Sequence, residues 1–281
     1  MSANADFIAV WNEILLPKFK RFRHVFVVGA EKHSGQALAR HAPAKGARVL
    51  DVGCGFGETT IDLAKRTGAP VLGLDCCQGM LDIAAADAHA ARADVSFVCG
   101  DAQTHRFDAP FDYLFARFGT MFFAAPKAAM KNLRASARPG AKLVALVWAE
   151  RKNNPCLEEA RAVALRHLPP PPEDGRTCGP GPFSWADVDV ARAILEGAGW
   201  TDVSFERVDA DILVGRTIEE AIDFAMELGP AGEIVREAKE RGIDKRDEVV
   251  ADLRAAFAPY LTPAGVVMAS SSWCITATNP G

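Results

Sequence analysis

The chain has 281 residues, 49% of them hydrophobic, and its formal net charge is −4 at pH 7. This composition excludes a disordered or fibrous protein, and the length allows one large domain or a core with an added lobe. The acidic balance provides no overall cationic field that would attract phosphate backbones or anionic membranes, so we expect no nucleic-acid partner.

The seven cysteines form neither a CxxC pair nor a Cys/His cluster at metal-ligand spacing, so the sequence predicts no metal site. Their odd number and the lack of a secretory leader favour reduced thiols in the cytoplasm. No apolar run approaches the ~20 residues that are needed to span a bilayer. We therefore expect a soluble, unprocessed, cytoplasmic protein.

The predicted elements begin with lead-in helices. Apolar side chains recur at helical spacing within residues 5–28, and a further helix is expected over residues 34–40. We assign residues 1–44 to these helices and predict that they form part of a lid. Residues 18–24 concentrate positive charge among aromatic side chains; we interpret this run as a solvated helix face, with a base-stacking or membrane-surface segment as the alternative.

From residue 45 to residue 149, short apolar runs alternate with alanine-rich segments, which is typical of a βαβ core. Buried strands are predicted at residues 48–52, 70–75, 94–99, 111–117 and 141–149, and helices at residues 57–67, 78–91 and 125–137. The alternation predicts a doubly wound, Rossmann-like α/β fold with right-handed crossovers and helices on both faces of the sheet. With the two strands that follow later, the sheet is seven-stranded and mostly parallel.

This rhythm breaks after the fifth predicted strand. Residues 150–184 contain a proline run and Gly-Pro repeats, so we predict an insertion loop there. Residues 185–215 and 262–281 return to the core sheet, with a helix at 185–198 and strands at 202–214 and 265–277. The helical segment 216–261 between them is predicted to be a substrate lid; a homodimer contact is the alternative.

A glycine-rich turn follows the first predicted strand and contains Gly53, Cys54, Gly55 and Gly57. Glycine permits the sharp turn and lets a ligand approach the backbone closely. Asp51 precedes this turn, where it would repel the pyrophosphate of a dinucleotide but attract the ammonium and sulfonium groups of S-adenosylmethionine. The glycine spacing also departs from the G-x-G-x-x-G form, so an NAD-dependent oxidoreductase is disfavoured.

Two further acids stand at the ends of the second and third predicted strands. Asp75 lies 22 residues after the first glycine of the turn, where a doubly wound fold brings a carboxylate over ribose hydroxyls; a helix cap is the alternative. Met80 faces either adenine or the core. In Gly100-Asp101-Ala102, Asp101 is placed to accept a hydrogen bond from the adenine amino group, with a simple turn former as the alternative. Ligands bind at this edge of open α/β sheets.

These motifs, together with residues 111–117 and 138–140, resemble the successive motifs of class I S-adenosylmethionine-dependent methyltransferases. The similarity is greatest to the UbiE-like group of ubiquinone/menaquinone C-methyltransferases. Residues 102–105, 117–123, 168–172 and 181–183 further resemble a bacterial subgroup of this family. The resemblance implies S-adenosylmethionine as cofactor and S-adenosylhomocysteine as product.

The resemblance also implies which residues contact the cofactor: Asp51 and the glycine turn at methionine and ribose, Asp75 at the ribose hydroxyls, Asp101 with Ala102 at adenine, and Arg117 with Phe118 close by. Cys76 and Gly100 flank these positions and are included in the predicted cofactor site. The pair Cys76-Cys77 departs from the family, in which a small polar or apolar residue is common after the second acid.

Methyl transfer from a sulfonium is an in-line displacement that depends on alignment and on exclusion of water, so no fixed catalytic triad is required. If a proton must be removed, histidine is the suitable side chain, and His33 and His105 are the candidates. A structural or surface histidine is the alternative for each. Aromatic residues near the strand ends favour a small, apolar organic acceptor.

Other functions fit parts of the same pattern. The fold also hosts aminopropyl transfer and nucleoside binding without turnover, and the motifs do not exclude either. Methylation of protein or nucleic acid is disfavoured by the acidic charge and by the lack of an Asn-Pro-Pro-Tyr-like segment after the fourth predicted strand. The sequence therefore predicts a small-molecule methyltransferase.

Overall fold

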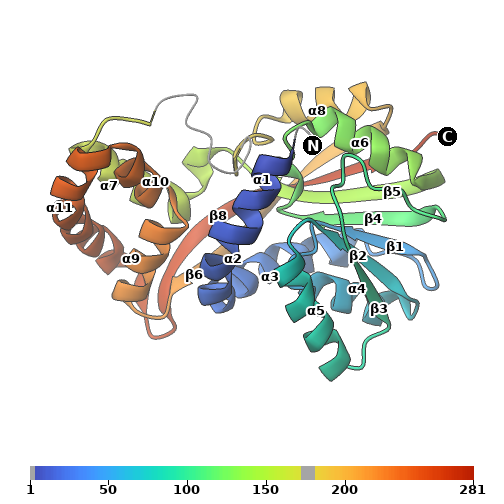
Figure 1. Ribbon diagram of the computed structural model, residues 1–281, viewed down its shortest axis with the longest axis horizontal. Coiled ribbons are helices and arrows are strands. Elements are labelled where there is room, and N and C mark those ends of the chain that lie inside the picture. Colours follow the sequence, from blue (N-terminus) through green and yellow to red (C-terminus); the bar gives the residue numbers. More distant parts are fainter. Residues whose placement is uncertain (1–3, 172–180) are drawn as a thin grey trace.

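The computed structural model describes residues 4–171 and 181–281. Its centre is one mixed sheet with the strand order β3-β2-β1-β4-β5-β8-β6, and a short strand, β7, pairs with β8. Helices pack around this sheet, and a separate group of helices lies beyond the ends of β6 and β8, at the left of Figure 1. The part of the predicted insertion loop at residues 172–180 lies outside the described residues.

One half of the sheet is parallel and follows the predicted βαβ order. Leu50 of β1 pairs with Leu72 of β2 on one side and with Leu114 of β4 on the other. Leu50 and Leu114 are fully buried, as strands covered on both faces require. The predicted doubly wound α/β fold is confirmed. Its elements are β1 (Val49–Val52), α4 (Glu58–Thr67), β2 (Val71–Asp75), α5 (Gln78–Ala90), β3 (Val95–Cys99), β4 (Phe111–Arg117), α6 (Pro126–Ala135) and β5 (Ala137–Trp148).

Strand β5 begins earlier than predicted, because the turn-forming residues at 138–140 do not interrupt it. Ala137 pairs with Phe111, and the register then shifts before Tyr113 pairs with Lys142. Gly140 adopts a φ of +80° within this irregularity, so the strand absorbs the glycine as a local bulge.

The sheet is completed by two long antiparallel strands, β6 (Thr201–Gly215) and β8 (Gly265–Thr278), next to helix α8 (Val188–Gly197). β8 pairs with β5 only as far as the Trp148–Ser272 pair. Beyond that point β6 and β8 pair with each other alone, down to Gly215 and Val266, with β7 (Leu261–Thr262) at the tip. This two-stranded ribbon extends from the sheet to the separate helices (Figure 1).

The separate helices form a helical lobe, defined here as α7 (Pro155–His167), α9 (Ile218–Glu227), α10 (Pro230–Glu237) and α11 (Lys239–Phe257). The lobe has its own core, in which Ile222 and Leu253 pack with Val266 and Met268 of β8. The predicted helical segment 216–261 contains α9, α10, α11 and the short turn η4 (Ala258–Tyr260), and its last residue, Leu261, belongs to β7. The predicted insertion loop, in contrast, contains α7, because Pro155 stands in the first turn, where proline starts a helix rather than breaking one.

The N-terminal cover, defined here as residues 4–21, consists of α1 (Ala5–Ala9), the π-helical turn η1 (Val10–Leu15) and α2 (Leu16–Arg21). It lies between the sheet and the helical lobe in Figure 1. Helix α3 (Arg23–Arg40) follows as one continuous helix where two were predicted. Gly29 allows it to approach β6, since a Cβ there would lie 3.1 Å from the Cβ of Ile212. None of the helices in the described ranges combines the length and apolarity needed to cross a membrane.

Candidate active site

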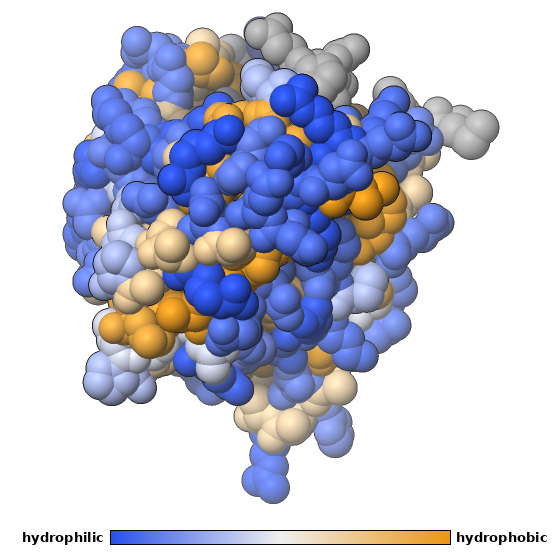
Figure 2. Space-filling view, turned by 90° about the vertical axis from the view of Figure 1, so that its left-hand side faces the viewer, coloured by the Kyte–Doolittle hydropathy of each residue, from blue (hydrophilic) through white to orange (hydrophobic). Residues whose placement is uncertain are grey.

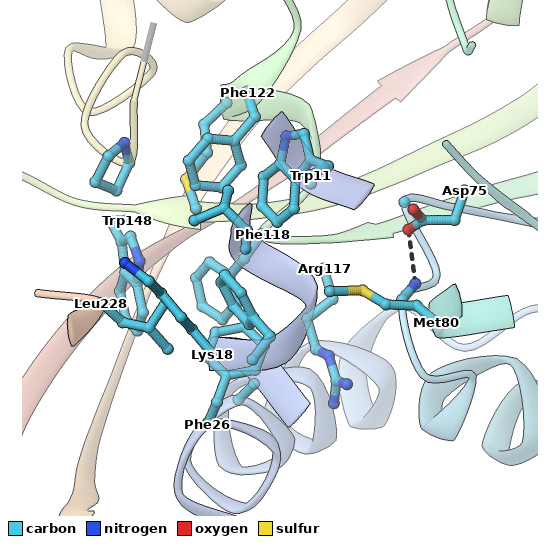
Figure 3. A pocket seen from close by; sticks show the side chains of 18 of the residues that line it. Trp11, Lys18, Phe26, Asp75, Met80, Arg117, Phe118, Phe122, Trp148 and Leu228 are labelled. Atoms are coloured by element: carbon cyan, nitrogen blue, oxygen red, sulfur yellow. Dashed lines mark hydrogen bonds between the residues drawn. The ribbon is translucent and has the colours of Figure 1, made fainter. Parts of the chain in front are cut away.

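A cavity of about 740 Å³ lies at the carboxyl edge of the parallel strands, enclosed by the sheet, the N-terminal cover and the helical lobe. Figure 3 shows Asp75 and Met80 on one side and Trp148, Leu228 and Lys18 on the other. All predicted cofactor residues except Gly57 line it, namely Asp51, Gly53, Cys54, Gly55, Asp75, Cys76, Met80, Gly100, Asp101, Ala102, Arg117 and Phe118.

This cavity has two regions. The strand-end half is the region lined by Asp51, the glycine turn, Asp75 and Asp101. The aromatic half is the region lined by Trp11, Phe26, Phe118, Phe122 and Trp148.

The glycine turn connects β1 to α4 with left-handed backbone at Gly53, Gly55 and Gly57. Gly57 does not line the cavity, and its requirement for glycine comes from packing. A Cβ on it would lie 2.8 Å from Cβ of Ala84 and 3.0 Å from Cζ of Phe97. The third glycine of the turn therefore lets α4 pack closely against α5 and β3.

Asp51 is almost completely buried, with 1% of its surface exposed. Thr60 on α4 donates a hydrogen bond of 2.7 Å to its Oδ2. Burial raises the pKa of Asp51 from 3.8 to about 7, although the Thr60 hydrogen bond and the positive charge of Arg117 lower it. The site thus holds a carboxyl group whose ionised form a nearby cationic ligand would stabilise.

Asp75, at the end of β2, connects the glycine turn to the start of α5. Its Oδ2 accepts a 2.8 Å hydrogen bond from the backbone N–H of Gly55, and its Oδ1 accepts one of 2.9 Å from Cys77 N–H. Burial raises the pKa of this carboxyl against the opposing effect of these backbone hydrogen bonds. Each oxygen keeps a lone pair, so the Cys77 contact at the helix start and a ligand contact are compatible.

Asp101 follows β3 and is already hydrogen-bonded from two sides. Its Oδ1 accepts from the backbone N–H of Gln103 at 2.9 Å, and its Oδ2 accepts from Nδ2 of Asn4 in the N-terminal cover at 3.1 Å. Asn12 of the cover donates to the carbonyl of Cys76 at 3.0 Å and accepts from the N–H of Gln78 at 3.2 Å. The cover is therefore attached directly to the loops that carry the predicted cofactor residues.

Arg117 at the end of β4 belongs to a chain of charges that the sequence motifs did not indicate. Its Nη2 lies 3.7 Å from Oε2 of Glu58, and Nε of Arg23 on α3 donates to the other oxygen of Glu58, Oε1, at 2.7 Å. Arg23 continues the chain to Asp87 at 2.6 Å. Burial lowers the pKa of the Arg117 guanidinium, which the charges of Glu58 and Asp51 oppose. The position of Glu58 next to Gly57 was the available signal in the sequence.

Comparisons with known proteins agree with this geometry. Residues 49–140, from β1 to the turn within β5, match a family model described as "Methyltransferase domain". The demethylmenaquinone methyltransferase of Renibacterium salmoninarum is 26% identical over 218 residues, which are 74% of this chain and 90% of that protein. The chain contains a methyltransferase domain and is an S-adenosylmethionine-dependent methyltransferase.

Solved structures support the fold of this methyltransferase. A candidate methyltransferase of Bacillus halodurans superposes with a TM-score of 0.57 at 16% identity, covering 88% of this chain and 98% of the other. Phosphoethanolamine N-methyltransferase 2 of Haemonchus contortus, in complex with S-adenosyl-L-methionine, has a TM-score of 0.51 at 20% identity, covering 88% and 53%.

The cofactor of the methyltransferase is S-adenosylmethionine, and the strand-end half fits its chemistry. The cofactor carries an ammonium and a sulfonium but no phosphate, and the strand-end half combines buried carboxyl groups with a glycine turn. Which part of the cofactor each residue contacts stays a prediction.

The aromatic half of the methyltransferase cavity is built around the end of β4. Phe118 stacks on Trp148 with ring centroids 4.1 Å apart, and its φ of +58° is unusual for a bulky residue. Trp11 of the N-terminal cover packs edge-on against Phe122, with ring centroids 5.2 Å apart. Strained backbone such as that of Phe118 often occurs at functional sites.

The two predicted histidine bases do not line the cavity. His33 is completely buried, and its two ring nitrogens lie 2.8 Å from the hydroxyls of Ser272 and Ser270. Burial lowers its pKa to about 4. His105 is partly exposed and packs its ring against Phe107. This placement favours the structural alternative for both, and a role as base stays an untested prediction.

Proposed function

We propose that this methyltransferase transfers the methyl group of S-adenosylmethionine to a small, largely apolar organic acceptor that binds in the aromatic half. The observation that carries the proposal is the continuity of the cavity, which joins the three strand-end acids to the aromatic wall. A molecule held by that wall would face the cofactor directly. The relationship to a demethylmenaquinone methyltransferase supports a small-molecule acceptor.

When bound, S-adenosylmethionine supplies an electrophilic methyl group on a positively charged sulfur. The protein contributes by binding the cofactor and the acceptor, by orienting them toward each other and by excluding water. Asp51 and Asp75 provide negative charge beside the glycine turn, and the stacked rings of Phe118 and Trp148 provide a flat wall against which an acceptor can be aligned. Trp11 and Phe122 line the same cavity in edge-to-face contact and reduce access of solvent.

We also propose that the N-terminal cover and helices α9 and α10 form the lid of this site. Arg21 of α2 forms salt bridges with Asp223 and Glu227 of α9, and these connect the N-terminal cover to the helical lobe. The outward face of the helical lobe is mainly hydrophilic (Figure 2), which favours a lid over the alternative of a buried homodimer contact.

The reaction type can be tested with S-adenosylmethionine deuterated in its methyl group and a panel of hydroxylated naphthalenes and quinols. We expect S-adenosylhomocysteine to form only when an acceptor is present, and the acceptor to gain the labelled methyl group, both measured by mass spectrometry. Release of methylthioadenosine would instead identify transfer of the 3-amino-3-carboxypropyl group, the aminopropyl-type alternative that S-adenosylmethionine can supply. Calorimetric binding of S-adenosylmethionine with neither product across the panel would favour the alternative of binding without turnover.

A further inference from the structure

Lys18 brings a positive charge to the aromatic half, and the proposed methyl transfer gives this charge no role. It projects from α2 and lines the cavity, and Figure 3 shows it directed toward the side that carries Leu228 and Trp148. Its ammonium donates to the backbone carbonyl of Glu227 at 3.2 Å. Lysine has three donors, so this contact with the end of α9 leaves two of them available.

The charged groups around Lys18 do not neutralise it. Within residues 4–171 and 181–281, no carboxylate forms a salt bridge with Lys18, and the side chain of Glu227 is engaged by Arg21. Burial lowers the pKa of Lys18, and so does repulsion by Arg236, which lines the same cavity, whereas the charge of Glu227 raises it. Lys18 is thus a partly buried cation beside an apolar wall.

Two more acids line this end of the cavity, Glu233 and Glu237 of α10. The negative charge of Glu233 raises the pKa of Arg151. Glu237 directly follows Arg236 in the helix. Neither acid is paired with Lys18 in the described structure. Arg151 and Arg236 line the same cavity, also without a salt bridge in the described residues, so this end of the cavity has positive charge that an anionic ligand would balance.

We propose that the methyl acceptor carries an anionic oxygen on its flat apolar body and that Lys18 binds this oxygen. The inference rests on the proposed function, because it concerns the acceptor of the same site. An ionised group enters an apolar cavity only at high cost unless a counter-charge receives it, and a buried lysine has the same need. Pairing the two offsets part of both costs, and because Lys18 is only partly buried its own desolvation is small, so Lys18 selects anionic acceptors over neutral ones of equal shape.

The test uses two matched ligand pairs and calorimetry on the full chain saturated with S-adenosylhomocysteine. Comparing 2-naphthoate with 2-naphthamide examines a carboxylate. Comparing 4-nitro-1-naphthol with 1-methoxy-4-nitronaphthalene at neutral pH, where the naphthol is ionised and the lysine is protonated, examines a phenolate. The variants are Lys18→Met, which keeps the apolar stem, Lys18→Arg, which keeps the charge, and Lys20→Met as the matched control on the exposed side of the same helix.

We expect the wild type and Lys20→Met to bind at least one anion about tenfold more tightly than its neutral partner, equivalent to about 1.4 kcal/mol. Lys18→Met should lose that preference while its affinity for the neutral ligand changes less than about twofold, and Lys18→Arg should retain it. Equal affinities within both pairs, or a preference that persists in Lys18→Met, would overturn the inference.

The same titrations separate this inference from the proposed function. If the neutral ligands bind and their anionic partners bind no better, the aromatic half is still an acceptor site and only the role of Lys18 is refuted. If S-adenosylhomocysteine binds but none of the four ligands does, both the anionic acceptor and the apolar acceptor site are refuted.

Discussion

Replacing Asp51 with asparagine should weaken cofactor binding and stabilise the ligand-free protein, two opposite effects with one cause. The pKa of Asp51 is about 7 in the folded protein, against an ordinary value of 3.8, because the carboxyl is buried. This difference corresponds to about 4 kcal/mol of unfolding free energy. Because the folded-state pKa is raised, this contribution is fully present below pH 4 and is lost as the pH rises through 7.

The asparagine side chain of this variant cannot ionise but can still accept the hydrogen bond from Thr60. The unfolding free energy of Asp51→Asn, measured by urea denaturation without ligand, should therefore exceed that of the wild type at pH 8 by up to ~4 kcal/mol. At pH 4 the two proteins should differ by less than ~1 kcal/mol, because the wild-type carboxyl is then neutral in the folded state and only about half ionised in the unfolded state. Asp62→Asn, on the exposed side of α4, is the matched control and should show no such pH dependence.

Cofactor binding should show the reverse pH dependence. If the ionised carboxylate receives a cationic ligand, the affinity of the wild type for S-adenosylmethionine should rise about tenfold between pH 6 and pH 8, with proton release near pH 7. Calorimetry in buffers of different ionisation enthalpy measures both quantities. Asp51→Asn should bind about 10- to 100-fold more weakly, with no proton release. Unchanged affinity in this variant and a flat pH profile in the wild type would refute the reasoning.

Four further outcomes are expected. Asp75→Ala should weaken S-adenosylmethionine binding by at least about tenfold in calorimetry, because it removes a charged acceptor from the strand-end half, whereas a pure helix cap would leave the affinity unchanged. Gly57→Ala should lower the unfolding free energy by about 1–3 kcal/mol, because φ is +80° and the new methyl group would overlap Ala84; an unchanged urea midpoint would contradict this. His33→Gln should make the protein less sensitive to acid. The pKa of His33 in the folded wild type, about 4, lies below the ordinary 6.5, so the wild type loses stability as the pH falls from about 6.5 toward 4. Melting temperatures measured across that pH range should therefore vary less in the variant than in the wild type. Asn12→Ala should accelerate dissociation of S-adenosylhomocysteine in stopped-flow measurements, and an unchanged rate would argue against the N-terminal cover as a lid.

The cofactor site was largely predictable because its signals are local in the sequence. A buried strand, a glycine turn and a helix follow one another within a few residues, and parallel strands bring their carboxyl ends to one edge. The order of these elements along the chain is therefore enough to place Asp51, Asp75 and Asp101 together. Gly57 shows the limit of this reasoning, since the exact course of the turn decides which glycine faces the cavity and which supports helix packing.

Other features depend on contacts between residues far apart in the chain. The partners of His33 are serines more than 230 residues away, and only the docking of α3 against β8 shows that both ring nitrogens are engaged. Asn12 and Lys18 are ordinary polar residues of a helical segment, with no local signal of function. They reach the cavity because the N-terminal cover lies between the sheet and the helical lobe.

The sequence by itself thus determined the α/β order, the cofactor and the edge of the sheet where Asp51, Asp75 and Asp101 meet, because short-range backbone geometry and charge decide these. The tertiary structure alone decided which aromatic side chains form a wall of the cavity, which helices cover it and that Lys18 lines it. Those properties arise from packing between distant segments, and a buried charge or hydrogen bond acquires its energy only in the environment that such packing creates.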